Sequence, residues 1–331
     1  MTEMHLVADE LVPPAGPDRR HLLAIGDLSA DDVQRLLATA RSFARSLERE
    51  MKKLPTLRGR TVVNLFYESS TRTSSSFELA AKRLSADTMS IKATGSAVDK
   101  GESLKDTALT LGAYEPDVIV VRHPRIGAPH LVVRHTRAHV VNAGDGKNQH
   151  PTQALLDLYA MQEALGRLEG LQVAIVGDVL HSRVARSLIQ ALRLVGAEVL
   201  LVAPPTLLPR GIEALGCECS FDIGAIADAD VVYALRMQSE RMQEGANYVP
   251  SLREYSALWS LTPERLRPGQ RLMHPGPMNR GVELDGRVAD AASALVTEQV
   301  RAGLVVRMAV LYDLLVHGPV EAKVTELEAV A

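Results

Sequence analysis

The sequence is short of the residues that mark secreted, zinc-binding or aromatic-rich proteins. Its 331 residues include two cysteines, Cys217 and Cys219, which lie too close together for an ordinary structural disulfide and are too few to form a zinc site alone. Aromatic residues make up only 4% of the chain, so its cores must be aliphatic, as is typical of parallel α/β layers. The shortage of cysteine favours a reducing compartment, and we expect a cytoplasmic protein.

Long apolar runs and a strong charge of one sign are also missing. No apolar stretch approaches the ~20 residues needed to span a bilayer. The first 20 residues lack the basic-then-apolar order of a signal peptide. A net charge of −3 argues against a general binder of nucleic acid or acidic membranes. We therefore expect no nucleic-acid partner and no membrane partner.

What the chain does have is an alternation of strand and helix patterns. Hydrophobic residues make up 46% of a chain that is long enough for two domains. The predicted strands are residues 61–66, 88–91, 117–121, 139–142, 172–176, 198–202, 231–233 and a strand near Leu272. Helical spacing follows Ser29, Ser70 or Thr71, Ser103, Pro151 and Ser182, and continues over residues 289–316. Because the connections are too long for hairpins, we predict an α/β protein of two domains, each a mostly parallel sheet with helices on both faces.

The segment that joins the predicted strand 61–66 to the next helix is rich in hydrogen-bond donors. It contains Ser70, Thr71, Arg72 and Thr73 at the point where the helix begins. Backbone N–H groups of a first helical turn, hydroxyls and a guanidinium together suit a phosphate. The same residues could also be a simple helix cap beside a solvated arginine, and on their own they do not decide between the two readings.

The turn after strand 172–176 could be mistaken for a dinucleotide site. Gly177 follows the strand, but the next positions are Asp178, Val179 and Leu180, so the G-x-G-x-x-G spacing is absent. His130, His135 and His139 lack a recognisable metal-ligand spacing, and we interpret them as structural or surface residues. We expect no cofactor and no metal.

Ser-Thr-Arg-Thr after a strand resembles the carbamoyl-phosphate motif of the aspartate/ornithine transcarbamoylase family, and further blocks follow in the family's order. These are residues 101–107 (GESLKDT), 122–124 (RHP), 142–146 (NAGDG), 150–153 (HPTQ), 236–238 (RMQ) and 274–277 (HPGP). The resemblance covers about residues 20 to 318 and is strongest to the family's aspartate-specific catalytic chains. Several ordered blocks are far more specific than one short motif.

The resemblance implies a domain for each substrate, with a cleft between them. Residues 1–150 would bind carbamoyl phosphate, and the C-terminal helix 290–331 would pack back on that domain. Residues 151–289 would bind L-aspartate. The implied reaction, a step of de novo pyrimidine biosynthesis, transfers the carbamoyl group to the aspartate amine and gives N-carbamoyl-L-aspartate and phosphate.

The family motifs also assign roles to residues of the carbamoyl-phosphate site. The phosphate would be held by Ser70, Thr71, Arg72 and Thr73. Thr73, Arg122 and His150 would polarise the carbonyl, and we count Arg72, Thr73, Lys100, Arg122 and His150 as catalytic. The carbamoyl amino group would be contacted by Gln153 and by the turn Pro275, Gly276 and Pro277, for which we predict a cis Gly276–Pro277 peptide.

The acceptor would be held by residues of the second domain and of a neighbouring subunit. Arg183, Arg236 and Gln238 match the family's contacts to aspartate, and arginine suits a carboxylate better than the cationic side chain of ornithine. Ser96 and Lys100 match residues that the family donates across a homotrimer interface. Assembly with dihydroorotase or a regulatory chain stays open.

Two other functions stay open at this point. One is a transcarbamoylase that uses another dicarboxylate or an amide acceptor. The other is a catalytically silent subunit that scaffolds a pyrimidine-pathway assembly. Six cationic or ionisable site residues argue against silence, because a scaffold has no physical need for them; they are Arg72, Lys100, Arg122, His150, Arg183 and Arg236.

Overall fold

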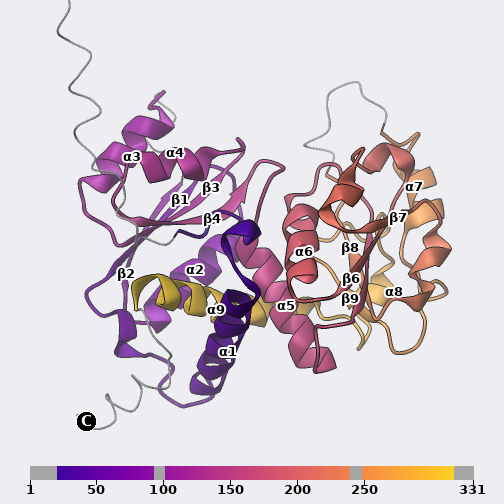
Figure 1. Ribbon diagram of the computed structural model, residues 1–331, viewed down its shortest axis with the longest axis horizontal. Coiled ribbons are helices and arrows are strands. Elements are labelled where there is room, and N and C mark those ends of the chain that lie inside the picture. Colours follow the sequence, from indigo (N-terminus) through magenta and orange to yellow (C-terminus); the bar gives the residue numbers. More distant parts are fainter. Residues whose placement is uncertain (1–20, 93–100, 239–247, 317–331) are drawn as a thin grey trace, which may run out of the picture. The chain divides into compact units, whose positions relative to one another are not determined.

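A computed structural model describes residues 21–92, 101–238 and 248–316 of the chain (Figure 1). These residues fall into two compact units. Unit 1 holds the described residues up to Asp27, Gln34–Gly146 and those from Leu304 onward. Unit 2 holds Leu28–Val33 and Lys147–Gly303. Each unit contains one parallel sheet with helices on its faces, which confirms the predicted fold class.

Unit 1 is built on a four-stranded sheet with the order β2-β1-β3-β4. Its strands are β1 (Thr61–Phe66), β2 (Asp87–Lys92), β3 (Val118–His123) and β4 (His139–Asp145), and all three pairings are parallel. The central strand β3 is buried at every residue, which is why its sequence is a continuous apolar run until Arg122. Parallel pairing places the carboxyl ends of all four strands at one edge of the sheet.

Helices cover both faces of this sheet (Figure 1). One face packs against α3 (Leu104–Gly112) and α4 (Ala128–Arg134) through a core that includes Val63, Ile119, Leu111 and Val132. Figure 1 shows α2 (Thr71–Arg83) on the opposite side of the sheet from α3 and α4. These layers leave the sheet's carboxyl edge as the place where loops carry polar side chains.

The C-terminal part of α9 (Val296–Leu315) and the body of α1 (Ala30–Ser46) complete unit 1. Arg307 of α9 is buried, donates to Ser76 Oγ of α2 at 2.7 Å and lies 5.1 Å above the ring centre of Phe77. Phe43 of α1 meets Tyr312 of α9 edge to face, with ring centres 5.7 Å apart. The end of α9 is therefore tied to α2, the helix that carries the predicted phosphate site.

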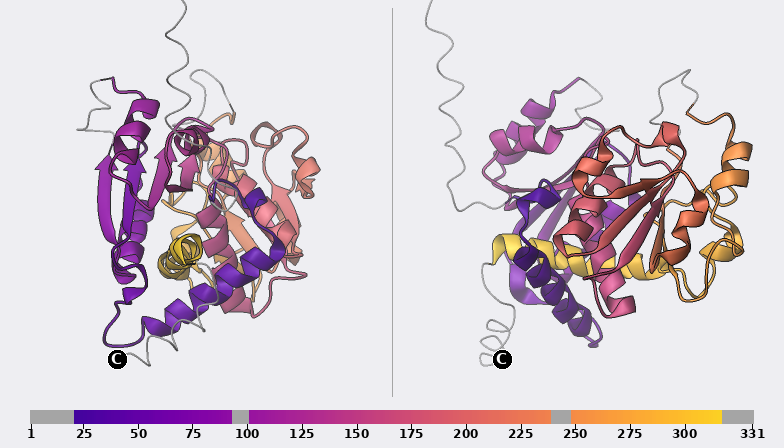
Figure 2. Two further views of the ribbon diagram at one scale, coloured as in Figure 1. Left: turned by 60° about the vertical axis from the view of Figure 1, so that its left-hand side comes forward. Right: turned by 45° about the vertical axis from the view of Figure 1, so that its right-hand side comes forward.

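Unit 2 is built on a five-stranded parallel sheet with the order β7-β6-β5-β8-β9. The right-hand view of Figure 2 shows the strands of this sheet side by side. Its strands are β5 (Gln172–Val176), β6 (Glu198–Val202), β7 (Glu218–Ser220), β8 (Val231–Ala234) and β9 (Arg271–Met273). Its helices are α5 (Pro151–Leu165), α6 (Arg183–Leu194), α7 (Leu252–Trp259) and α8 (Gly286–Ala289), with the start of α9. Val176, Val202, Val232 and Leu272 share a core with Leu284 and other residues near α8.

The predicted strands agree closely with the observed ones, but the predicted single helix over residues 289–316 is wrong at its start. The described chain forms the short helix α8 up to Ala289 and begins α9 only at Val296. Between them the backbone runs beside β9, where Leu272 N–H donates to Ser293 O at 3.0 Å and Leu295 N–H donates to Leu272 O at 2.8 Å. Pairing with the sheet edge has overridden the local helical pattern. The prediction also missed the short elements β7, α4 and α7.

Among the residues that the structure describes, no helix is both long enough and apolar enough to cross a membrane.

Candidate active site

The predicted anion cradle is a capped helix start at the carboxyl edge of the unit 1 sheet. Ser70 has an extended backbone (φ −157°) and caps α2, with its Oγ accepting from Thr73 N–H at 3.4 Å and donating to Thr73 Oγ1 at 3.0 Å. Thr73 is buried, whereas Thr71 and Arg72 are exposed. The first turn of α2 therefore carries hydroxyls, N–H groups and a guanidinium within three residues, which is the donor set that a phosphate needs.

Arg122 joins this cradle from the neighbouring strand. It lies at the end of β3 in register with Phe66 of β1, and its carbonyl accepts from Tyr67 N–H at 2.8 Å. Its buried guanidinium donates to Glu68 Oε1 at 2.7 Å and to Ala143 O at 3.1 Å. The register of β1 with β3 thus brings the Arg122 guanidinium to Glu68, which lies 54 positions away in the sequence.

Ser96 and Lys100, which the sequence assigns to a neighbouring subunit's site, lie outside the described residues. The same is true of residues 239–247, most of the polar loop that follows Gln238.

In unit 2, the start of α5 positions His150 and Gln153. His150 is the residue before the first turn, and its N–H donates to Ser187 Oγ of α6 at 2.8 Å. Pro151 occupies the first helical position, where its missing N–H costs nothing. Gln153 N–H donates to His150 O at 3.0 Å, and both side chains are buried. Two polar groups with hydrogen-bonding capacity therefore occupy one end of a mostly apolar helix.

Arg183 begins α6 directly after its cap. Ser182 Oγ accepts from Ala185 N–H at 3.1 Å, and the Arg183 side chain is buried. The preceding turn depends on Gly177, which has φ +114°; a Cβ there would lie 2.9 Å from Tyr255 Oη and 3.0 Å from Leu235 O. This close approach explains why the turn has a glycine without being a dinucleotide site.

Asp178 in the same turn connects it to the residues that follow β8. The buried Asp178 carboxylate contacts His181 Nδ1 at 2.9 Å through Oδ1 and accepts from Gln238 N–H at 3.2 Å through Oδ2. The polar segment 236–238 is therefore held beside the turn that carries Arg183. Burial, reinforced by the charges of Glu283 and Asp178, raises the pKa of the Tyr255 hydroxyl, so this side chain stays neutral.

The turn at residues 274–277 follows β9 and has the predicted cis Gly276–Pro277 peptide. Gly276 N–H donates to His274 Nδ1 at 2.7 Å, so this ring nitrogen is the acceptor. The other ring nitrogen, Nε2, must then carry the proton and donate to Glu283 Oε1 at 3.1 Å. The same Glu283 oxygen accepts from Asn279 N–H at 2.6 Å, so Glu283 links the first residue of the turn to Asn279, two residues beyond its end.

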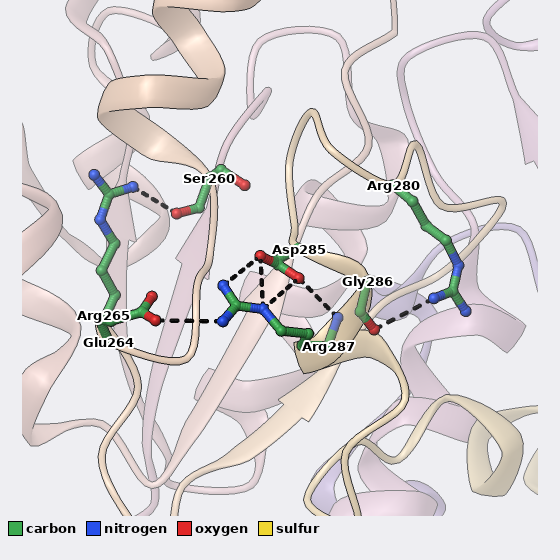
Figure 3. A network of polar contacts seen from close by, with 7 residues as sticks. All are labelled: Ser260, Glu264, Arg265, Arg280, Asp285, Gly286 and Arg287. Carbon is green, nitrogen blue, oxygen red and sulfur yellow. Dashed lines mark hydrogen bonds and ion pairs between the residues drawn. The ribbon is translucent and has the colours of Figure 1, made fainter.

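Exposed ion pairs link residues of the segment that follows this turn, and Figure 3 shows the pair of Arg287 with Asp285. Arg280 binds both oxygens of Asp290 at 2.7 Å, and Arg287 contacts Asp285 at 2.8 Å. Hydrogen bonds from Arg287 lower the pKa of Asp285, and hydrogen bonds from Arg280 do the same for Asp290. These pairs are solvent-exposed, and we assign them a local structural role and no part in binding.

Two family models match the chain in the order of its units. The aspartate/ornithine carbamoyltransferase carbamoyl-P binding domain matches residues 20–163, and the Asp/Orn binding domain of the same family matches residues 169–314. The chain belongs to the aspartate/ornithine carbamoyltransferase family.

Within this family the chain is similar to aspartate carbamoyltransferase catalytic subunits. It is 56% identical to that of Acidothermus cellulolyticus over 90% of this chain and 93% of the relative. It is 54% identical to that of Pelotomaculum thermopropionicum over 88% of this chain and 96% of the relative.

Two solved structures of the family are also similar. Aspartate transcarbamoylase of Trypanosoma cruzi in complex with N-(phosphonacetyl)-L-aspartic acid has a TM-score of 0.82 and 31% identity, over 91% of this chain and 97% of that one. The catalytic subunit of M. jannaschii aspartate transcarbamoylase has a TM-score of 0.78 and 35% identity, over 89% of this chain and 97% of that one.

In this member of the family, sequence reasoning missed the residues that hold the predicted site residues in place. Glu68 contacts Arg122, Asp178 holds Gln238, and Asp157 accepts from Gln153 Nε2 at 3.0 Å. Glu68 lies two residues before the cradle, a position that could have drawn attention to it. Asp157 follows Gln153 by one helical turn in an otherwise apolar stretch, and an isolated acid on a buried helix is a signal that can be read from sequence.

Proposed function

We propose that this chain transfers the carbamoyl group of carbamoyl phosphate to the amine of L-aspartate, giving N-carbamoyl-L-aspartate and phosphate in de novo pyrimidine biosynthesis. The observation that carries the proposal is the 56% identity, over nine-tenths of the chain, to a protein whose name states this activity. The T. cruzi relative has been crystallised with carbamoyl phosphate and aspartate, which are the two substrates of this reaction.

Unit 1 residues bind and activate the carbamoyl donor in this proposal. The first turn of α2 holds the phosphate through Ser70, Thr71, Arg72 and Thr73. Arg122, held between Glu68 and Ala143 O, donates to the carbonyl oxygen. As the tetrahedral intermediate forms, negative charge grows on that oxygen, so donors aimed at it stabilise the transition state more than the ground state.

Unit 2 residues complete the donor site and bind the acceptor. His150 joins Thr73 of unit 1 in donating to the carbonyl oxygen, while Gln153 and the turn Pro275, Gly276 and Pro277 accept from the carbamoyl amino group. Arg183, Arg236 and Gln238 bind the aspartate carboxylates, and Lys100 of a neighbouring subunit adds a positive charge. The neutral aspartate amine then attacks the carbonyl carbon, a C–N bond forms, the C–O bond to phosphate breaks, and the proton lost by the amine nitrogen leaves with the phosphate. No covalent enzyme intermediate is needed, because positioning and electrostatics supply the rate enhancement.

Aspartate, not ornithine, is the proposed acceptor. Arg236 and Gln238 follow β8, and Arg183 is buried at the start of α6 in the same unit. Two arginines near a cationic side chain would cost free energy, whereas each can form paired hydrogen bonds to a carboxylate. A basic acceptor would therefore be excluded by charge.

The proposal is tested by measuring phosphate release from carbamoyl phosphate with aspartate, with ornithine, with asparagine or with no acceptor. We expect release above the uncatalysed rate with aspartate only. Release with ornithine or asparagine would assign a different acceptor. No release with any of them would favour the silent scaffold.

We also propose a cytoplasmic homotrimer in which Ser96 and Lys100 of one subunit act in the site of the next. A lysine placed close to a phosphate is stabilised by the opposite charge, and a cyclic head-to-tail interface repeats the same donation at every contact. The free thiols of Cys217 and Cys219 are compatible with a reducing compartment. Dihydroorotase and a regulatory chain are candidate further partners.

A further inference from the structure

Asp157 is a fully buried acid that has no role in the mechanism above. It lies on α5, one turn after Gln153, with no measurable exposure of its side chain. A buried charge is costly unless hydrogen bonds compensate it. Here Gln153 Nε2 donates to Oδ1 at 3.0 Å, Gln299 Nε2 donates to Oδ1 at 2.7 Å, and Tyr233 Oη donates to Oδ2 at 2.8 Å.

The chemistry of this cluster fixes which way the Gln153 amide points. An ionised carboxylate only accepts hydrogen bonds, so Gln153 must present its NH₂ group to Asp157. Its carbonyl oxygen, Oε1, then points away from Asp157 as an acceptor. Burial and the nearby Asp157 raise the pKa of Tyr233 well above its usual value, so this hydroxyl keeps its proton and remains available as a donor.

The same carboxylate oxygen is also linked, through Gln299, to the turn at residues 274–277. Gln299 Oε1 accepts from His274 N–H at 3.0 Å, and a backbone N–H can only donate, so the Gln299 NH₂ group must face Asp157. His274 in turn accepts from Gly276 N–H at 2.7 Å through Nδ1. One chain of hydrogen bonds therefore runs from Gln153 through Asp157 and Gln299 to the turn.

We propose that Asp157 is a positioning residue that selects the carbamoyl group by its amino group. This inference rests on the proposed function. Asp157 aims Gln153 Oε1 at the carbamoyl NH₂ and, through Gln299, holds the backbone of the 274–277 turn. Both elements then present acceptors to the same donor group. A substrate with a methyl group in place of the NH₂ would leave these acceptors unpaired and would be rejected.

Two substitutions of Asp157 test whether its role depends on the acceptor oxygen or only on the bulk of the side chain. Asp157→Asn can keep an oxygen toward Gln153 and Gln299, because its NH₂ group can donate to the Tyr233 hydroxyl, which also has acceptor capacity. Asp157→Leu keeps the branched shape, with two larger methyl groups in place of the oxygens, and removes the acceptor. Gln299→Met keeps the contact between Asp157 and Gln153 and removes both hydrogen bonds of the branch, the one to Asp157 Oδ1 and the one from His274 N–H.

The readout is the ratio of kcat/KM for carbamoyl phosphate to kcat/KM for acetyl phosphate, with aspartate saturating. We expect Asp157→Asn to keep this ratio within about threefold of the wild type and Asp157→Leu to lower it at least about tenfold. The loss should be in kcat/KM for carbamoyl phosphate and not in kcat/KM for acetyl phosphate. Inhibition by inorganic phosphate, which reports on the cradle of unit 1, should not change.

An unchanged ratio in folded Asp157→Leu, or an equal loss in Asp157→Asn, would overturn the inference. If Asp157→Leu does not fold, Gln299→Met decides, with an expected loss of at least about threefold in the ratio. An unchanged ratio in that variant would likewise overturn it. A wild-type protein that makes no N-carbamoyl-L-aspartate would instead refute the proposed function and the inference together.

Discussion

The Arg122 guanidinium is held by Glu68, with Nη2 2.7 Å from Glu68 Oε1 and the Arg122 side chain 10% exposed. Nη1 of the same arginine donates to Ala143 O at 3.1 Å. Two fixed contacts leave the guanidinium with one orientation, which is what a donor to a developing oxyanion requires. Glu68 therefore positions a residue that the sequence marks as catalytic.

Glu68→Gln should lower turnover without unfolding unit 1. The glutamine keeps an oxygen toward Arg122 but loses the charge, and the difference between a charged and a neutral hydrogen bond is about 1–2 kcal/mol. That difference corresponds to a fall in kcat of roughly 5- to 30-fold. The matched control is Asp117→Asn, since Asp117 pairs with Arg60 at 2.7 Å just before the other end of β3. Equal losses in the two variants would show a general effect on unit 1, and no loss in Glu68→Gln would remove Glu68 from the account.

Arg72→Ala should abolish useful turnover and leave stability unchanged. Arg72 is exposed on the first turn of α2, so its removal should change the free energy of unfolding by less than about 0.5 kcal/mol. Each charged hydrogen bond to phosphate is worth ~1.5–3 kcal/mol, and two of them predict a loss of at least ~10²-fold in kcat/KM for carbamoyl phosphate. Arg58→Ala removes an exposed arginine of the same unit and serves as the control. Near-normal kinetics of Arg72→Ala would refute the phosphate assignment.

How far the sequence could predict this structure differs between local and distant features. The cap at Ser70 and the strands 61–66, 172–176 and 198–202 were predicted because they depend on neighbouring residues. The Arg122–Glu68 pair depends on the register between β1 and β3, which no local pattern encodes. The break before α9 was missed because residues 293–295 pair with β9 instead of following their helical pattern. Asp157 could be noticed as an isolated acid on a buried helix, but its partners Tyr233 and Gln299 could not be predicted, because they come from distant parts of the sequence.

If sites are shared between subunits, two inactive variants should complement each other. Mixed trimers of Arg72→Ala and Lys100→Ala, made by dissociation and reassociation, will contain some sites that take Arg72 from one chain and Lys100 from its neighbour. Random mixing of equal amounts should leave about a quarter of the sites intact in a cyclic arrangement. The control is wild-type protein taken through the same treatment. Hybrid trimers that stay inactive, while the control recovers, would place both residues in one chain.

Cys219 should react slowly with alkylating agents in the folded protein. Burial is the main cause that raises the pKa of its thiol to about 11, and the nearby Glu213 carboxylate adds to the shift. Since the thiolate is the nucleophile, alkylation at pH 8 should be ~10²-fold slower than in the unfolded chain, where a thiol pKa of ~8.5 applies. Iodoacetamide labelling of a Cys217→Ala variant between pH 7 and 9.5 should show a rate that rises about tenfold per pH unit. A plateau within that range would contradict the raised pKa.

The proposed reaction forms a bond between the carbamoyl carbon and the aspartate nitrogen, and isotope labelling can detect that bond. Carbamoyl phosphate labelled with ¹³C and aspartate labelled with ¹⁵N should give a product whose carbonyl carbon is split by one-bond coupling to nitrogen, with one phosphate released for each product molecule. Reactions with no enzyme and with Arg72→Ala measure the uncatalysed background. We expect the coupled signal to be well above both with aspartate, and no signal above background with ¹⁵N-labelled ornithine. Absence of the coupled signal with aspartate, or its appearance with ornithine, would contradict the account.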